Sequence, residues 1–484
     1  MFVAAGYRRR STCDVTHPSV TLASREFMLR SKYRTEPVET TGMPPGIGYI
    51  VGNEAAERFS FYGMRGILVV FMTTYLLDSQ GNPDYMTDEQ AKSWFHLFMM
   101  GVYFFPIFGS LLSDGVLGKY STIIWLSIVY CAGHAALAID DTRVGLALGL
   151  ILIAVGSGGI KPCVSANVGD QFGPSNKHLL EKVYGWFYFS INFGSMFSTV
   201  LIPWLLAHHG PSVAFGVPGI FMGIATLVFW MGRYKFAHRP PGGVGFLRDA
   251  FGPEGRSILG SLILLYSFVA IFWALYDQTG SAWILQASHM DLNWFGIQLT
   301  AAQTHTANPI MILAFIPIFS YVIYPALNKV ITLTPLRKLG MGFLLTALSF
   351  CMSALIESWI QAGEKPSINW QFLAYAIMTA GEVMVSITGL EFSYTQAPPS
   401  MKSVVMSLWL LAVAAGNFLT AMINILIQDE AGNSRISGVD YYLFFSAMMA
   451  VTAVVFALVA SRYRYRSYIQ GDTEALAEGT AEGL

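Results

Sequence analysis

Residues 144–160 read VGLALGLILIAVGSGGI, a stretch without a single charged side chain. The chain stays largely apolar from 143 to 166. A helix needs about 20 mostly apolar residues to cross a hydrocarbon core of about 30 Å. Because lipid offers no hydrogen bonds to a backbone, a segment of this length is predicted to cross the membrane as a helix.

The same pattern recurs along the chain and predicts the fold class. Polar connections separate the apolar segments, and the longest, 235–255, is rich in Pro and Gly. We therefore predict an all-α membrane protein with 12 transmembrane helices in two six-helix bundles, with a substrate site between the bundles. The twelve segments are 47–77, 91–113, 119–139, 143–166, 181–207, 214–234, 256–287, 305–327, 337–360, 369–397, 400–428 and 437–462.

Composition agrees with a membrane protein. Of the 484 residues, 54% are hydrophobic and 12% are charged, about half the charged fraction of roughly 25% in soluble domains. The formal net charge of −1 gives no overall field that would attract nucleic acid. We therefore expect no nucleic-acid partner. We also expect no metal site and no cofactor, since the four cysteines form no CxxC pair and no metal-ligand spacing; they are Cys13, Cys131, Cys163 and Cys351.

The basic residues predict the orientation, because Lys and Arg concentrate in cytoplasmic connections. Most of the 29 basic residues lie on the side of both termini, which we predict to be cytoplasmic. The exceptions in the outer connections are Lys92, Arg143, Lys365 and Arg435. The predicted organisation is a disordered cytoplasmic tail (1–46), an N-terminal six-helix bundle (47–234), a cytoplasmic linker (235–255), a C-terminal six-helix bundle (256–466) and a cytoplasmic tail (467–484).

Seven charged residues lie deep within the predicted membrane helices. Each costs about 2.5–3.5 kcal/mol on insertion scales, so each must face a partner, a cavity or water. The set carries a formal charge of −1, which one bound proton would neutralise. Two interpretations fit: structural ion pairs that tie helices together, or a network whose pairing changes during function. The seven are Glu54, Glu57, Arg58, Arg65, Lys161, Asp277 and Glu382.

The first predicted helix favours a network that changes its pairing. At about 100° per residue, Glu54, Arg58, Phe61 and Arg65 share one face, and Glu57 is adjacent to it. A structural ion pair needs two residues, whereas this stripe holds two acids and two bases. Protonation of a carboxylate releases its basic partner, which can then bind an anionic group of a substrate. The stripe therefore predicts transport coupled to protons.

Polar and aromatic side chains in other predicted helices are candidates to line a central cavity. Taken singly, an intramembrane Asn or Ser is more often a contact between helices, and a lone His or Trp is more often packed. A free imidazole nevertheless titrates near neutral pH, so a pair of His96 with Asp277 would close the outer mouth and admit protons there. The remaining candidates are Tyr103, Tyr188, Asn192, Ser195, Trp273, Gln278, Asn308 and Ser386.

Several motifs resemble one known family. Residues 54–63, EAAERFSFYG, resemble the ExxERFxYYG signature of the proton-coupled oligopeptide transporter (POT) family, with Phe61 in place of the first Tyr. The stretches 158–166 (GGIKPCVSA), 272–278 (FWALYDQ) and 389–398 (GLEFSYTQAP) resemble its other signatures. The connection 113–119, SDGVLGK, resembles the signature loop of the major facilitator superfamily, with Gly115 in place of a basic residue.

The resemblance implies a role for each matching residue. Glu54, Glu57, Arg58 and Lys161 would couple protons, and His96 with Asp277 would form the outer gate. Arg65 and Lys161 would attract the carboxylate of a peptide, and Glu382 would hold its free amine. The remaining peptide-binding residues would be Tyr103, Tyr188, Asn192, Trp273, Asn308 and Ser386.

The implied function is a proton-coupled symporter that imports di- and tripeptides by alternating access. It would be a multi-pass protein of the cell membrane, a functional monomer and not an enzyme. Two alternatives are a transporter of nitrate or another small anion on the same fold, and a peptide sensor that does not transport. Glu382 argues against the anion transporter, because an acid in the cavity repels an anion. The lost hydroxyl at Phe61 removes any hydrogen bond that the family makes there.

Overall fold

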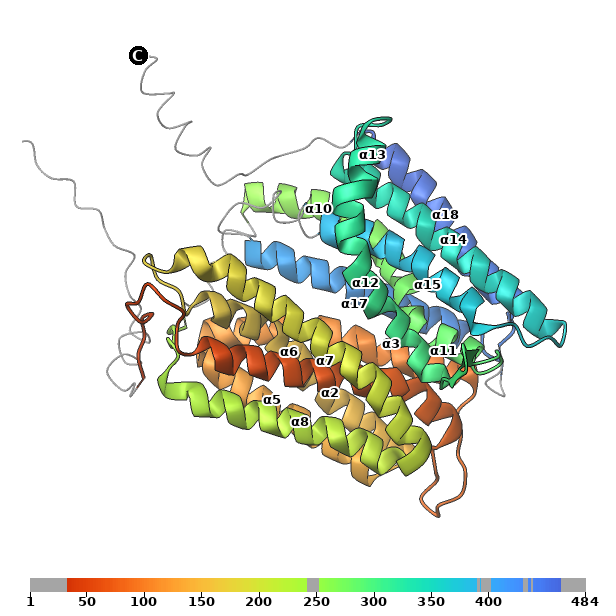
Figure 1. The fold of residues 1–484 in the computed structure, drawn as a ribbon, viewed down its shortest axis with the longest axis horizontal. Helices are drawn as coiled ribbons and strands as arrows, with labels where there is room; N and C mark the ends of the chain where they lie inside the picture. Colours follow the sequence, from red (N-terminus) through yellow and green to blue (C-terminus); the bar gives the residue numbers. More distant parts are fainter. Residues whose placement is uncertain are drawn as a thin grey trace, which may run out of the picture.

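The computed structural model describes residues 33–241, 252–389, 392, 402–429, 434–436 and 438–462, and nearly all of them are helical (Figure 1). The N-terminal half comprises α2 (Ile47–Thr74), α3 (Asp88–Phe104), α4 (Pro106–Leu112), α5 (Lys119–Ile139), α6 (Arg143–Gly169), α7 (Leu180–His209) and α8 (Pro211–Met231). The C-terminal half comprises α10 (Pro253–Tyr276), α11 (Ala282–Ala287), α12 (Ala307–Ile318), α13 (Tyr324–Asn328), α14 (Pro335–Gln361), α15 (Ile368–Glu382), α17 (Lys402–Leu426) and α18 (Val439–Ala460).

Several predicted spans are interrupted by turns that are not α-helical. A 3₁₀ turn, Asp277–Gly280, separates α10 from α11, and a π-helical turn, Val383–Ile387, follows α15 directly. A 3₁₀ turn at Ala301–Thr306 precedes α12. Such interruptions in long helices often mark functional sites. Two of them lie next to Asp277 and Glu382, which are intramembrane acids.

The helices account for the twelve predicted spans. Within the described residues, eleven helices or runs of helices are long and apolar enough to cross a membrane by length and composition. The remaining one, α2, has 28 residues and is long enough, but it carries the charged stripe. The predicted all-α membrane fold is therefore confirmed, whereas the cytoplasmic location of the termini stays a prediction.

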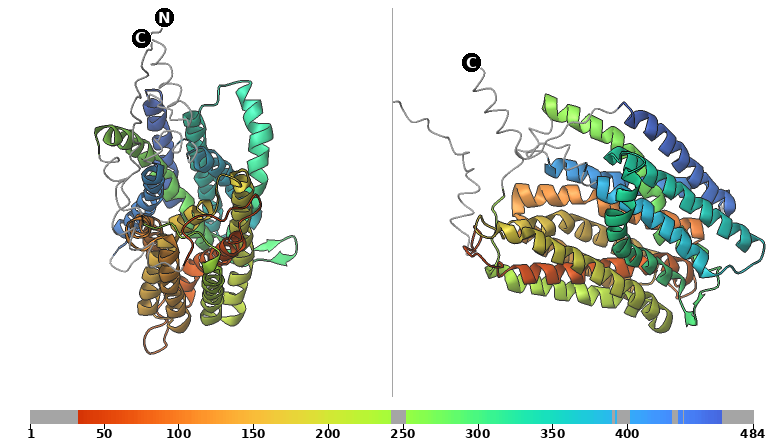
Figure 2. Two further views of the ribbon diagram at one scale, coloured as in Figure 1. Left: turned by 90° about the vertical axis from the view of Figure 1, so that its left-hand side faces the viewer. Right: turned by 45° about the horizontal axis from the view of Figure 1, so that its top comes forward.

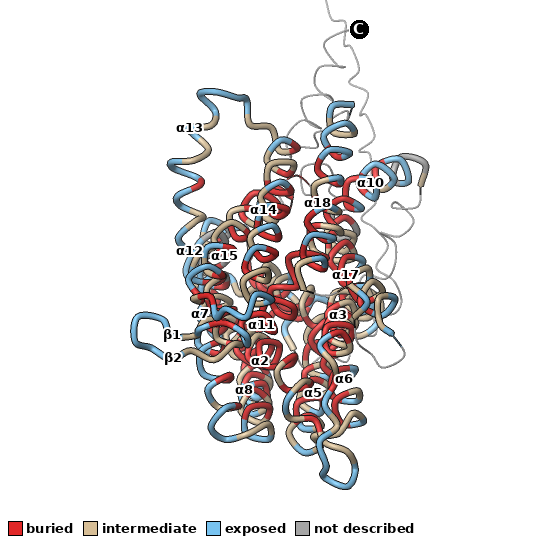
Figure 3. Tube along the Cα trace, turned by 90° about the vertical axis from the view of Figure 1, so that its right-hand side faces the viewer, coloured by how far each residue is buried: buried red, intermediate tan, exposed pale blue. Residues whose placement is uncertain are grey.

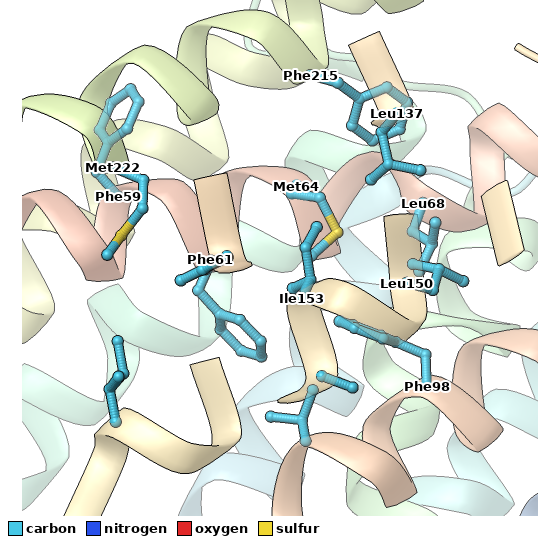
Figure 4. Close-up of a cluster of buried hydrophobic side chains, with 14 of the residues drawn as sticks. Phe59, Phe61, Met64, Leu68, Phe98, Leu137, Leu150, Ile153, Phe215 and Met222 are labelled. Atoms are coloured by element: carbon cyan, nitrogen blue, oxygen red, sulfur yellow. The ribbon is translucent and has the colours of Figure 1, made fainter. Parts of the chain in front are cut away.

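Each half has its own hydrophobic core. One cluster of buried side chains comes from the N-terminal half, apart from Leu285, and a second comes from the C-terminal half. Buried residues line the inner faces of the helices and exposed ones the outside, as expected for helices that face lipid (Figure 3). Phe61, Met64 and Phe98 belong to the first core (Figure 4). Phe61 is fully buried, so the residue that departs from the family signature is a packing residue here.

The two halves meet along α3 and α17, which pack side by side between them (Figure 1). A short antiparallel hairpin of β1 (Asn293–Trp294) and β2 (Ile297–Gln298) projects from the helices (Figure 2). It follows α11 and lies at the end where α2 ends and α3 begins. We call this end of the protein the α2–α3 end.

Residues 33–46 correct one expectation, that residues 1–46 form a disordered tail. Asn176 donates a side-chain hydrogen bond to the carbonyl of Gly42, and Ser175 does so to that of Thr40. The Tyr33 ring stacks on His238 with centroids 4.5 Å apart. Aromatic stacking and backbone acceptors thus hold this polar segment against the N-terminal half, which hydropathy cannot reveal. Residues 1–32, residues 242–251 of the predicted linker and the whole predicted tail 467–484 lie outside the described residues.

Close packing of α4 on α6 generates a stability prediction. A Cβ added to Gly109 would overlap the backbone of Gly159, so Gly109→Ala must push the two helices apart. Overpacking of this kind costs about 1–3 kcal/mol. We expect a lower melting temperature in detergent for this variant. The matched control is Gly223→Ala in α8, where a Cβ meets no atom within 4 Å; an equal loss in both variants would contradict the packing argument.

Candidate functional site

The predicted charged stripe of α2 forms a buried triad. Arg58 Nε lies 2.6 Å from Glu54 Oε1 and 3.0 Å from Glu57 Oε2. Both carboxylates are only 2% exposed. Ser157 from α6 donates a hydrogen bond of 3.2 Å to the other oxygen of Glu57. Two carboxylates therefore share one guanidinium, and the triad has an excess negative charge inside the membrane-spanning part of the N-terminal half.

Lys161 lies on α6, near this triad, with a different set of neighbours. Its Nζ is 4.0 Å from the centroid of the Phe61 ring and 5.1 Å from that of Tyr103. It makes no ion pair with any carboxylate in the described part of the chain. The ring at position 61 thus offers its face to the ammonium even though the hydroxyl of the family signature is missing.

Arg65 connects the two halves rather than standing free for a ligand. Its Nη2 lies 2.6 Å from Asp277 Oδ1, at the break between α10 and α11. Arg65 is 5% exposed and Asp277 is 1% exposed. The expectation that Arg65 attracts a peptide carboxylate therefore requires this pair to open first.

His96 does not contact Asp277 directly, so the expected His–Asp pair is wrong in its geometry. Asn417 of α17 lies between them: its Nδ2 donates to Asp277 Oδ2 at 2.6 Å, and its Oδ1 lies 2.8 Å from His96 Nδ1. Because the amide nitrogen of Asn417 faces Asp277, His96 Nδ1 must carry the proton that Oδ1 accepts. His96 Nε2 lies 2.9 Å from the Ser281 hydroxyl. The predicted gate residues are thus joined through a third residue.

Asn417 is a residue that the sequence reasoning missed. It stands in the stretch LAVAAGNFLTAM of 411–422, where it is an isolated amide among apolar residues. Such an intramembrane Asn signals a polar contact between helices. The signal names the residue but not its partners, since these come from segments more than a hundred residues away.

Glu382 lies at the end of α15 among uncharged partners. The Tyr276 hydroxyl donates to Glu382 Oε1 at 2.9 Å, and Asn308 Nδ2 donates to Oε2 at 2.7 Å. Asn308 also donates to Thr379 at 3.1 Å. No described Lys, Arg or His pairs with Glu382. Asn308, which is predicted to bind peptide, thus lies beside Glu382 together with Tyr276 and Thr379.

The structure places the other predicted peptide-binding residues in different surroundings. The Trp273 ring packs edge-on against Tyr276, 5.2 Å between centroids, and so lies beside the Glu382 site. Ser386 falls in the π-helical turn after Glu382, and its buried Oγ has no hydrogen-bond partner in the part of the chain that the structure describes. The side chain of Tyr188 lies outside the described residues, and Asn192 lies on α7.

Contacts between the halves gather at the α2–α3 end among the residues that the structure describes. Besides the Arg65 pair, Gln428 donates to Ser93 at 3.1 Å and Gln303 donates to the carbonyl of Val200 at 3.0 Å. Together with the packing of α3 on α17, these contacts close the protein at this end.

We expect Asp277→Asn to destabilise the protein and to loosen the α2–α3 end. The change leaves the buried Arg65 guanidinium without its carboxylate, and breaking a buried ion pair in this way costs about 3–5 kcal/mol. The melting temperature in detergent should fall, and a cysteine placed at Ser93 should react faster with a polar maleimide.

The matched control is Asp84→Asn, which removes the same group from Arg143 at a pair whose side chains are 37% and 40% exposed. Arg143 hydrogen bonds hold the pKa of Asp84 below its usual range, but water screens this pair and little change is expected. Equal effects of the two substitutions would show that burial of the Arg65 pair does not matter.

Comparisons with known proteins place this geometry in a family. The sequence profile of the POT family matches residues 120–252 and 249–437. Peptide transporter family 1 of Drosophila melanogaster is 40% identical over 361 residues, which are 65% of this chain and 48% of that protein. Solute carrier family 15 member 2 of Homo sapiens is 34% identical over 401 residues, 72% of this chain and 54% of that protein. The chain thus spans about half the length of the curated relatives it matches.

The fold of the chain also matches a solved structure over nearly the whole length of that structure. The crystal structure of an auto-inhibited POT family peptide transporter is 37% identical to the chain and superposes with a TM-score of 0.81. The match covers 88% of this chain and 99% of that one. The fold is therefore the major facilitator fold, and this multi-pass membrane protein belongs to the POT family.

Proposed function

We propose that the protein is a proton-coupled symporter that imports di- and tripeptides by alternating access. The observation that carries the proposal is a pair of uncompensated charges of opposite sign, one in each half. Lys161 in the N-terminal half has no ion-pair partner, and Glu382 in the C-terminal half has none either, among the described residues. A zwitterionic peptide would supply both missing partners, its carboxylate to Lys161 and its ammonium to Glu382.

The names of the relatives support a peptide as the substrate. The Drosophila protein and the auto-inhibited protein of known structure are both described as peptide transporters. Glu382 adds a chemical reason, because a carboxylate that already accepts two neutral hydrogen bonds can hold an ammonium but repels nitrate. The anion transporter remains an outcome of the test below.

The Glu54–Arg58–Glu57 triad supports proton coupling. One proton on either carboxylate would bring the triad to zero charge, which lowers the cost of moving it within the membrane interior. Protonation would also weaken the hold on Arg58, whose charge then becomes available near Lys161. Each proton carried across 100 mV is worth about 2.3 kcal/mol, or roughly 50-fold accumulation of a neutral zwitterion.

The closed α2–α3 end supports alternating access. If this end faces outward, as the distribution of basic residues predicts, the Arg65–Asp277 pair and its link through Asn417 to His96 are the outer closure. We infer that opening this closure frees Arg65 for an incoming peptide carboxylate. We also propose that the protein acts as a monomer in the plasma membrane and has no enzymatic activity.

The first test is uptake of labelled dialanine into liposomes that contain the purified protein, under an inward proton gradient. We expect uptake that the gradient drives, that Glu57→Gln abolishes and that excess unlabelled nitrate leaves unchanged. Loss follows because the amide cannot take up the coupling proton. If nitrate moves and the peptide does not, the substrate and the role of Glu382 are wrong.

A second test separates recognition of the amine from coupling. We expect Glu382→Gln to raise the concentration for half-maximal dialanine uptake at least tenfold, since a hydrogen-bonded ion pair is worth about 1.5–3 kcal/mol. The preference for dialanine over N-acetyl dialanine should shrink in parallel. Glu364→Gln, in the exposed connection between α14 and α15, is the matched control and should leave both quantities unchanged. A preserved preference in Glu382→Gln would place the amine elsewhere.

A further inference from the structure

A separate polar cavity lies at the α2–α3 end, away from the Lys161 and Glu382 sites. Its volume is about 290 Å³. Asp88, Glu89 and Lys92 of α3 line one wall. The other walls come from the C-terminal half, from α11, α14 and α18. The cavity is therefore complete only while the two halves are closed at this end.

Three carboxylates line the cavity, those of Asp88, Glu89 and Glu357, against one lysine, Lys92, and one histidine, His289. Lys92 Nζ pairs with Glu89 Oε2 at 2.6 Å. The other two carboxylates, Asp88 on α3 and Glu357 on α14, have no ion-pair partner among the described residues. They face one cavity from opposite halves of the protein, and a bound cation would stabilise both carboxylates.

Gln286 supplies an independent acceptor. Its Nε2 donates to the Ser353 carbonyl at 3.0 Å and to Glu357 Oε2 at 2.8 Å, which fixes the orientation of the amide. Its Oε1 is buried and has no hydrogen-bond donor among the described residues, and Gln286 is only 3% exposed. A buried acceptor without a donor is costly, so a donor from a ligand in the cavity would satisfy it.

The cavity already accommodates one ammonium group of the protein itself. Lys92 Nζ lies 3.8 Å from the centroid of the Tyr441 ring, a contact that crosses from α3 to α18. Ring faces and carboxylates together are the surroundings that aliphatic ammonium groups prefer. In contrast, no three His, Cys, Asp or Glu residues of the described ranges come together as metal ligands.

We propose that this cavity binds a small aliphatic diamine, with one ammonium near Asp88 and the other near Glu357 and Gln286. Because the two acids belong to different halves, the bound diamine bridges them only in the closed state and stabilises that state. The binding itself stands apart from the proposed function. Only its consequence, slower opening during peptide uptake, rests on that function.

Thermal unfolding of the purified full chain tests the binding without any transport. We expect 1,4-diaminobutane to raise the melting temperature with increasing concentration, since a ligand of the folded state stabilises it by mass action. Neither 1,4-butanediol, of the same length without charge, nor NaCl at matched ionic strength should do so. The double variant Asp88→Asn with Glu357→Gln keeps the shape of the cavity. Its affinity for 1,4-diaminobutane should be lower by a factor of about ten or more.

The assignment of a diamine site would be overturned by an equal rise in melting temperature in any of three measurements: the double variant with the diamine, or the unchanged protein with NaCl or with Ca²⁺. Dialanine uptake with the diamine on both sides of the membrane tests the consequence. The maximal rate should fall, the concentration for half-maximal uptake should stay constant, and the double variant should be insensitive. Competition with the peptide instead would place the diamine in the central site. Melting shifts without any peptide uptake would refute the proposed function but keep the cavity as a diamine site.

Discussion

The ion pair between Arg65 and Asp277 is the constraint on which the arrangement of the two halves depends. Each charge alone would cost several kcal/mol inside the membrane, so each needs the other. Arg65 belongs to α2, and Asp277 stands where α10 gives way to a 3₁₀ turn. Satisfying both charges therefore draws the N-terminal and C-terminal halves together at one end. Asn417 and His96 complete the same network and add hydrogen bonds to the closure.

Charges elsewhere in the membrane-spanning part follow two patterns. The triad of Glu54, Glu57 and Arg58 is internally paired and carries one excess negative charge. Lys161 and Glu382 instead form no ion pair within the described residues: Lys161 lies against aromatic rings, and Glu382 accepts hydrogen bonds from neutral groups. Paired groups can exchange partners when a proton arrives, whereas unpaired groups are ready to receive a ligand. In the proposed function, the separate sites for the proton and the peptide follow from which charges the fold leaves unpaired.

Much of the fold was predictable because hydropathy acts locally. A run such as 144–160 must become a helix in lipid whatever its neighbours do, and twelve such runs define the fold class. The charged candidate residues are predictable for the related reason that a charge in an apolar run is costly. The segment 33–46 was missed since its contacts, such as that of Tyr33 with His238, rest on stacking with residues two hundred positions away.

Hydropathy predicts the membrane helices and the charged residues within them, and the motifs predict the family. The pairing of these charges is visible only in the folded protein, where Arg65 pairs with Asp277 and His96 contacts Asn417 rather than Asp277. The folded protein also brings Asp88 and Glu357 to one cavity from opposite halves. The physical reason is range. Transfer into lipid is a property of each segment, but an ion pair or hydrogen bond depends on a few ångströms between groups that the chain separates by hundreds of residues.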